Sequence, residues 1–135
     1  MIGILVVTHG KLAKELVNAL EMIVGEQERV HALSIDWEVD VAEAKGLIGK
    51  ALSQCGRKNV LVLTDMFGGT PTNVVLPFAG DDVEVVTGVN LPMLIKACQS
   101  RMKPLSEVAR LVCDQGRQSV QIAGDLLKAG ASSRD

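Results

Sequence analysis

Aromatic residues are almost absent from this chain: its 135 residues include no tyrosine, two phenylalanines and one tryptophan. The apolar fraction is nevertheless 47%, and valine, leucine, isoleucine and alanine supply most of it. Long apolar runs are also missing, so no stretch is long enough to cross a bilayer. Short aliphatic runs are typical of parallel strands that helices cover on both faces. The composition therefore favours an α/β fold, and the length favours one domain with a hydrophobic core of its own.

An excess of charge of one sign is lacking too. The 14 basic and 16 acidic residues give a net charge of −2, which provides no basic surface for nucleic acid or an anionic membrane. The three cysteines are widely spaced and form no Cys-x-x-Cys pair, as is typical of thiols in a reducing compartment. No basic segment or cleavage site precedes the first apolar run, so we expect no signal peptide. These features predict a cytoplasmic protein that is not membrane-embedded and does not bind nucleic acid.

Several common catalytic motifs are missing as well. The chain has no Gly-x-x-x-x-Gly-Lys-Ser/Thr loop for nucleotide hydrolysis. Its two histidines and three scattered cysteines do not have the spacing of zinc ligands. A response-regulator receiver needs acidic residues after its first strand, and a histidine phosphatase needs an arginine where Thr8 stands and a second catalytic histidine. We therefore expect neither a metal ion nor a cofactor.

Short apolar runs alternate with amphipathic segments along the chain. Apolar runs predict strands, and apolar residues three and four positions apart predict helices. We expect strands at residues 2–7, 30–35, 60–64 and 83–86, and helices at residues 11–24, 41–53, 72–78, 91–100 and 106–116, the last with Ser106 as its N-cap. This alternation predicts a doubly wound, mainly parallel sheet with right-handed crossovers. In strand order 2-1-3-4, the loops after residues 7 and 64 border the crevice where such sheets bind ligands.

His9 follows the first predicted strand and precedes a predicted helix. An imidazole at this place is a candidate nucleophile or ligand, whereas a loop histidine without chemistry is the alternative. His31, the other histidine, falls within the second predicted strand, where a structural role is expected. The segment after the third strand favours chemistry at His9, because it supplies the groups that a reactive imidazole needs.

That segment begins with Asp65, whose carboxylate can fix the tautomer of His9 and leave the other ring nitrogen free to attack. Gly68 and Gly69 allow backbone conformations in which successive amides converge on an anion. Thr70 is the predicted N-cap of the helix whose first position is a proline, and a helix N-terminus favours a phosphoryl group. Each feature alone could be only a cap or a tight turn. Together they predict a site that holds a phosphoryl group on His9.

Three segments of the chain resemble the enzyme IIA component of the mannose family of the bacterial sugar phosphotransferase system. They are Val-Thr-His-Gly at 7–10, Asp-Met-Phe-Gly-Gly-Thr-Pro at 65–71 and Gly-Val-Asn-Leu-Pro-Met at 88–93. The resemblance extends from residue 1 to about residue 127, and the order and spacing of the segments match. The related dihydroxyacetone-kinase phosphocarrier typically has Ser-His-Ser and Asp-Met-Gly-Ser instead, so the mannose branch fits better.

The resemblance implies a phosphocarrier. The histidine matching His9 takes a phosphoryl group from phospho-HPr and passes it to an enzyme IIB, the aspartate matching Asp65 hydrogen-bonds that histidine, and the residue matching Thr70 helps bind the phosphoryl oxygens. Serine is common at the last position, and threonine keeps its hydroxyl. A regulatory binding protein of the same fold, switched by phosphorylation of His9, is the alternative. The sugar cannot be inferred, because the membrane components would determine it.

The family resemblance also bears on the C-terminal part of the chain. Relatives form homodimers through an exchanged antiparallel edge strand, so we expect Ser119–Ile122 to form such a strand rather than to extend the helix. Residues 1–128 are predicted to be a single phosphocarrier domain and residues 129–135 a frayed tail. No linker to a IIB domain follows, so we expect enzyme IIB on a separate chain. Trp37 is expected either at the rim of the crevice or packed over the second helix, and residues 90–92 either beside the crevice or as a helix cap.

Overall fold

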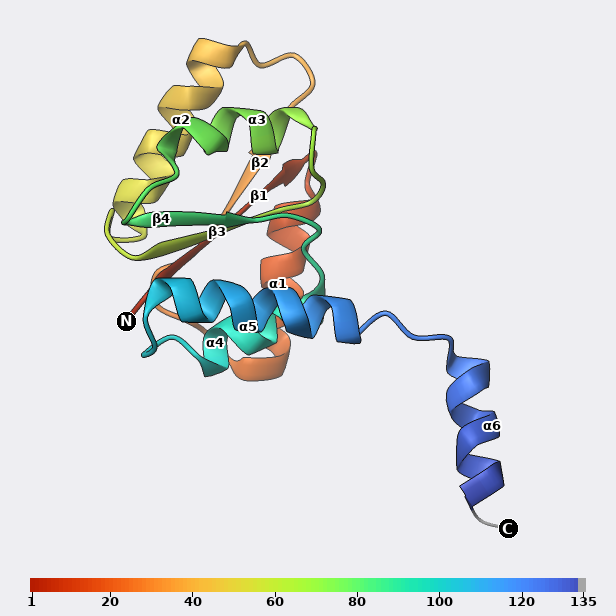
Figure 1. Cartoon of the computed structure of the whole chain (residues 1–135). Helices are drawn as coiled ribbons and strands as arrows, with labels where there is room; N and C mark the ends of the chain where they lie inside the picture. The colour runs from red at the N-terminus through yellow and green to blue at the C-terminus, as the bar shows by residue number, and fades with distance from the viewer. Residues whose placement is uncertain (134–135) are drawn as a thin grey trace.

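The computed structural model describes residues 1–133 and contains one parallel sheet with helices on both of its faces (Figure 1). The elements in chain order are β1 (Gly3–His9), α1 (Leu12–Val24), β2 (Val30–Ile35), α2 (Val41–Gln54), β3 (Val60–Thr64), α3 (Thr70–Val75), a 3-10 turn η1 (Leu76–Phe78), β4 (Val83–Val86), α4 (Leu91–Gln99), α5 (Leu105–Gln118) and α6 (Ala123–Ser133). Strands and helices alternate from β1 to α4, as the sequence predicted. In this part of the chain, no helix combines the length and apolarity needed to span a bilayer.

The four strands of the sheet are all parallel and lie in the order β2-β1-β3-β4. Both the fold class and the strand order that the sequence predicted are therefore confirmed. In the register, Val7 lies opposite Thr64 of β3 and His9 lies opposite Ile35 of β2. Because parallel strands end at the same edge, the loops that follow β1, β2 and β3 meet there.

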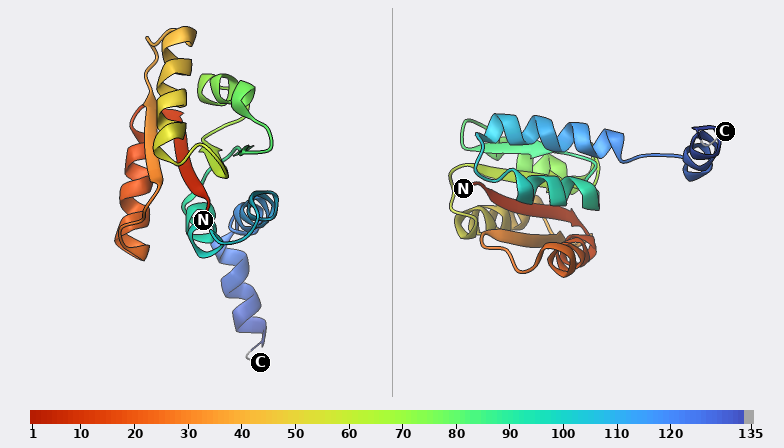
Figure 2. Two further views of the ribbon diagram at one scale, coloured as in Figure 1. Left: turned by 90° about the vertical axis from the view of Figure 1, so that its left-hand side faces the viewer. Right: turned by 90° about the horizontal axis from the view of Figure 1, so that it is seen from below.

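Alternate side chains of β1 supply two separate hydrophobic cores. Helices α1, α4 and α5 cover one face of the sheet, and α2 and α3 cover the other (Figures 1 and 2). Ile4 and Val6 pack into the first core, whereas Leu5 and Val7 pack into the second. All four side chains have no exposed surface. Apolar burial on both faces explains why this strand reads as a continuous aliphatic run, and it fixes the register that places His9 at the sheet edge.

Three predicted helix starts are wrong by one or two residues, and the first of these helices, α1, begins at Leu12 instead of residue 11. α3 begins at Thr70 with Gly69 as its N-cap, so Thr70 does not cap the helix. α5 begins at Leu105 with Pro104 in the cap position, and Ser106 lies inside the first turn. The extended Pro104 (ψ 145°) aims its carbonyl at the amides of residues 107 and 108, so the helix forms without a side-chain cap.

Ser119–Ile122 forms neither a strand nor an extension of the helix in this single chain, and its exchange between two copies stays a prediction. α5 continues to Gln118, Ser119 bonds back to Gln115, and a short extended linker leads to α6, which points away from the body of the molecule (Figures 1 and 2). A strand needs a neighbour to accept its hydrogen bonds, and none of the described strands lies beside this segment. The tail predicted to fray from residue 129 is helical as far as Ser133, and residues 134–135 lie outside the described part.

Candidate functional site

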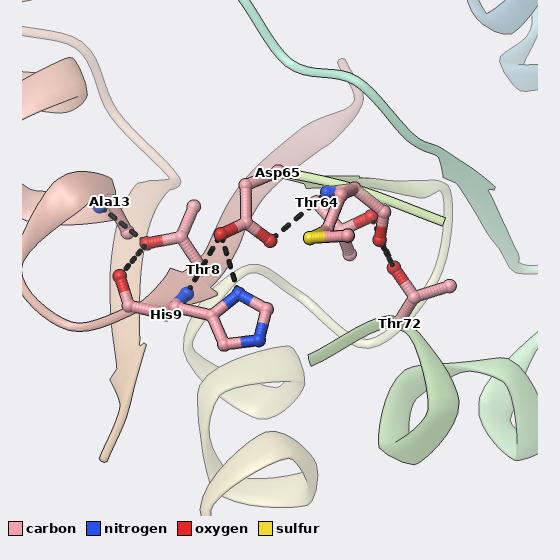
Figure 3. A network of polar contacts seen from close by, with 7 residues as sticks. Thr8, His9, Ala13, Thr64, Asp65 and Thr72 are labelled. Atoms are coloured by element: carbon pink, nitrogen blue, oxygen red, sulfur yellow. Dashed lines mark hydrogen bonds and ion pairs between the residues drawn. The ribbon is translucent and has the colours of Figure 1, made fainter. Parts of the chain in front are cut away.

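The adjacent strands β1 and β3 bring His9 and Asp65 together, although they are 56 residues apart in sequence. The His9 Nδ1 lies 2.7 Å from the Asp65 Oδ2, and the same oxygen accepts the His9 backbone N–H at 3.0 Å (Figure 3). The other carboxylate oxygen accepts the backbone N–H of Met66 at 3.0 Å. Backbone and ring are therefore fixed by one carboxylate, which is itself held by its own loop.

The charge of Asp65 determines the tautomer of His9. Burial pushes the pKa of Asp65 upward, but the hydrogen bonds from the His9 ring and backbone N–H, together with the interaction with His9 as a charge, outweigh it and hold the pKa below its ordinary value. An ionised carboxylate only accepts hydrogen bonds, so Nδ1 carries the proton. Nε2 then has the lone pair, and no described residue hydrogen-bonds to it. In this tautomer Nε2 is the ring nitrogen that stays open to another group.

Thr8 shapes the turn that follows β1. Its hydroxyl oxygen accepts the backbone N–H of Ala13 at 2.7 Å and donates to the carbonyl of His9 at 3.2 Å (Figure 3). Gly10 adopts a left-handed conformation (φ 54°) and donates its N–H to the Ile35 carbonyl. This role of Thr8 could not be predicted from sequence. A threonine at the end of a strand looks the same whether its hydroxyl bonds the next turn or has no partner.

Gly69 lies against the edge of the His9 ring. A Cβ built at this position would stand 2.7 Å from Cε1 and 3.2 Å from Nε2 of His9, so only glycine allows the loop to approach so closely. Thr70 and His9 line the same cavity of about 50 Å³, which has room for a group of a few heavy atoms. Gly68 has φ 85° and turns the chain without a close neighbour of its own.

Thr72 ties the loop between β3 and α3 to the end of β3. Its hydroxyl donates to the Met66 carbonyl at 2.6 Å and accepts a hydrogen bond from the Thr64 hydroxyl at 2.7 Å, since its single proton is already committed (Figure 3). Both threonines are buried. This bridge could not be predicted from sequence, since one threonine was expected only to end a strand and the other only to begin a helix.

The structure thus brings four of the five predicted site residues to one place: His9, Asp65, Gly69 and Thr70. His31 lies within β2, opposite Leu5, and takes no part in the site. The Asn90 side chain accepts the N–H of Met93 at 3.1 Å and donates to the Gly116 carbonyl at 3.4 Å, as a helix cap would. In residues 1–133 no three His, Cys, Asp or Glu side chains cluster as metal ligands would.

Trp37 lies at the rim of the crevice, which was one of its two expected places. Its ring centroid is 5.0 Å from that of His9, and the side chain lines the small cavity together with Ile35 and Val39. Packing over the second helix, the other expectation, is not found, because the residue is 84% exposed.

The chain is similar in sequence to proteins of one known family. Residues 3–111 match the EIIA-man family model, described as PTS system fructose IIA component. The mannose-specific EIIAB component of Escherichia coli K12 is 35% identical over 128 residues, which include 89% of this chain. This chain spans only 39% of the length of that relative.

Solved structures are similar over nearly the whole chain. A phosphotransferase system EIIA component from Streptococcus agalactiae has a TM-score of 0.83 and 27% identity, covering 93% of this chain and 99% of the other. The mannose/sorbose-specific IIA subunit from Enterococcus faecalis has a TM-score of 0.82 and 30% identity, covering 90% and 93%. The family match, these similarities and the fold together show that the chain belongs to the mannose family of phosphotransferase system enzyme IIA components.

Proposed function

We propose that this chain is a phosphocarrier in sugar uptake, taking a phosphoryl group from phospho-HPr on His9 and passing it to an enzyme IIB. The observation that carries the proposal is the His9–Asp65 pair, in which Nδ1 is held at 2.7 Å and Nε2 faces the Gly69–Thr70 loop. Family membership supports the same function. We assign His9 as the nucleophile, Asp65 as its partner, and Gly68, Gly69 and Thr70 as the groups that bind the phosphoryl oxygens.

The transfer step follows from the tautomer. The Nε2 lone pair of His9 forms a bond to phosphorus while the P–N bond of the donor breaks, and that electron pair returns to the donor imidazole. The proton on Nδ1 stays between His9 and Asp65, so the positive charge that develops on the ring faces a carboxylate. Loop amides and the Thr70 hydroxyl supply the donors for the phosphoryl oxygens. Donation of the phosphoryl group from His9 to enzyme IIB uses the same groups: the P–N bond at Nε2 breaks, and its electron pair returns to the His9 ring.

The loops that follow His9 and Asp65 support protein partners rather than a small-molecule substrate. Three apolar side chains close in sequence to these two residues are exposed: Leu12 at 47%, Met66 at 54% and Phe67 at 75%. Exposed apolar side chains on the loops of a candidate site are typical of a surface that another protein covers. The cavity beside His9 is too small for a sugar.

The test is incubation of the intact chain with enzyme I, HPr and phosphoenolpyruvate, followed by mass measurement. We expect one phosphoryl group, acid-labile and alkali-stable, which His9→Ala abolishes and His31→Ala leaves intact. Label that persists in His9→Ala would contradict the site. A labelled protein that donates to no cognate enzyme IIB would instead favour the regulatory alternative, in which phosphorylation of His9 is only a switch.

We further infer that two copies pair through the C-terminal segment. β4 is an edge strand that pairs only with β3 among the described strands, and a groove of about 550 Å³ beside it is lined in part by Val85, Val86 and Val120. Beyond the end of α5, three apolar side chains are exposed: Val120 at 79%, Ile122 at 71% and Leu127 at 75%. An open edge and an uncovered apolar segment suit exchange between two copies.

The oligomeric state tests this second inference. Light scattering after size-exclusion chromatography should give a dimer for the intact chain and a monomer for a variant that stops after Gln118. An intact chain that stays monomeric at high micromolar concentration would contradict the exchange. The mass measurement at His9 does not depend on this outcome.

A further inference from the structure

Trp37 is the only tryptophan in the chain, and its position serves no core. The side chain is 84% exposed, yet its ring centroid lies 5.0 Å from that of His9 with the two planes 31° apart. Burial of an indole normally stabilises a fold through the area that it removes from water. Here little area is removed, so the contact with the imidazole needs another explanation.

The backbone holds Trp37 in place. β2 ends at Ile35, beside His9 in the register, and the turn that follows is closed by the N–H of Val39 donating to the Asp36 carbonyl at 3.2 Å. One residue later Asp40 caps α2, its carboxylate accepting the N–H of Glu43 at 2.7 Å. Trp37 therefore lies on a short turn that is anchored at both ends, next to His9, the last residue of β1.

The His9 ring is thus held on three sides. Asp65 holds Nδ1, Gly69 lies at the Cε1–Nε2 edge, and the indole lies next to the imidazole with its plane tilted by 31°. The first and third of these contacts oppose rotation of the imidazole about its bond to Cβ. An electron-rich indole face also attracts a ring that carries positive charge, as the imidazole does when Nε2 bonds to phosphorus while Nδ1 keeps its proton.

We propose that Trp37 is a positioning residue for His9: it holds the imidazole with Nε2 in the small cavity and shields the phosphorylated ring from water. The phosphoryl step is the one given above, in which the new P–N bond to Nε2 replaces the P–N bond of the donor, and Trp37 changes no bond. The proposal rests on the proposed function for its kinetic consequence. The stacking itself does not.

The stacking is tested by NMR without any phosphoryl donor. The chain has two histidines, so His31 serves as an internal reference for the ring protons of His9. The indole ring current should displace the His9 ring protons, and Trp37→Ala should return them to values close to those of His31. His9 resonances that do not move in Trp37→Ala would overturn the proposal, whatever the protein's function.

The kinetic test uses phosphoramidate, a small phosphoryl donor that needs no docking surface. Trp37→Ala should slow phosphorylation of His9 about three- to tenfold and speed hydrolysis of the phosphohistidine by a similar factor, with Trp37→Phe restoring most of both. The control is Met102→Ala, which removes an equally exposed apolar side chain (81%) beside Arg101, at the other edge of the sheet. It should change neither rate.

Two outcomes separate the alternatives. Wild-type protein that phosphoramidate leaves unlabelled at His9 would contradict the proposed function while the NMR result stands. Trp37→Ala that raises only the KM for phospho-HPr, with hydrolysis and His9 resonances unchanged, would make Trp37 a docking residue and overturn the proposal.

Discussion

A nitrogen-bearing side chain lies at each end of β1, and hydrogen bonds hold the two in opposite ways. At the amino end Arg101, which follows α4 and is 6% exposed, donates twice to the Ile2 carbonyl, at 3.0 and 2.7 Å. At the carboxyl end the His9 side chain is 20% exposed and bonded through one nitrogen only. Arg101 is buried and spends its hydrogen bonds on the backbone, so it stabilises the fold. His9 is hydrogen-bonded through Nδ1 only, so Nε2 stays available for chemistry.

The largest effect is expected at the carboxyl end, in Asp65→Asn. The amide is nearly isosteric, so the protein should fold, but it loses the charge that stabilises a cationic ring and fixes the tautomer. Acceptance from phospho-HPr should slow roughly ten- to a thousandfold, about 1.4 to 4 kcal/mol of barrier. Rapid-quench labelling measures it. Unchanged transfer in both directions would show that Asp65 only caps its loop.

Gly69→Ala should also act at the carboxyl end of β1, by displacing the His9 ring. The backbone at this residue (φ −84°) accepts alanine, so the added methyl acts only through its 2.7 Å approach to the His9 Cε1. We expect transfer to fall by about ten- to a hundredfold with little change in Tm. The matched control is Gly116→Ala, whose Cβ would stand 2.6 Å from the Met93 Sδ. That variant should lose stability and keep its transfer rate, and the reverse pattern would break the comparison.

Arg101→Met should show the opposite behaviour at the amino end. It removes both side-chain donors to the Ile2 carbonyl while keeping an apolar stem of similar length. The free energy of unfolding should fall by about 1 to 3 kcal/mol, measured by urea denaturation. Transfer under folding conditions should stay within twofold. A variant of full stability with impaired transfer would mean that the two ends are coupled.

The smallest effect is expected on removing metal ions. In the proposed mechanism Asp65, loop amides and the Thr70 hydroxyl stabilise the charge that develops at the carboxyl end of β1, so we expect no requirement for a divalent ion. Phosphoryl exchange between phospho-HPr and this chain, assayed apart from enzyme I, should survive excess chelator unchanged. Loss of exchange that magnesium restores would point to a different mechanism.

Much of this architecture follows from local sequence, because its strands are short aliphatic runs with polar ends. β2, β3 and β4 have the predicted bounds, and β3 is the clearest case, buried throughout and followed by Asp65. Helix starts were predicted less well. Gly69 and Pro104 occupy the N-cap positions of α3 and α5, although a nearby Thr or Ser fits the usual cap preference better. Local preference differs little between neighbouring positions, and tertiary packing decides among them.

The site residues were predictable in kind, but not in their contacts. His9 and Asp65 could be placed together because strand order sets which loops meet. The Thr64–Thr72 bridge and the contact of Trp37 with His9 depend on side-chain directions that no periodicity encodes. The strand expected in the C-terminal segment stays a prediction, because a strand is defined by its neighbour and the described strands of one chain offer none beside this segment.

The position of β1 in the middle of the sheet has a consequence for how the protein matures. The segment that carries His9 is synthesised early, yet the carboxylate that orients it arrives 56 residues later, after β3 has been made and paired. Bringing these residues together requires the non-local strand pairing that is slow to form in folding. A nascent or misfolded chain therefore has the imidazole without the carboxylate that orients it. Under the proposed function, the ability to accept a phosphoryl group belongs to the folded chain alone.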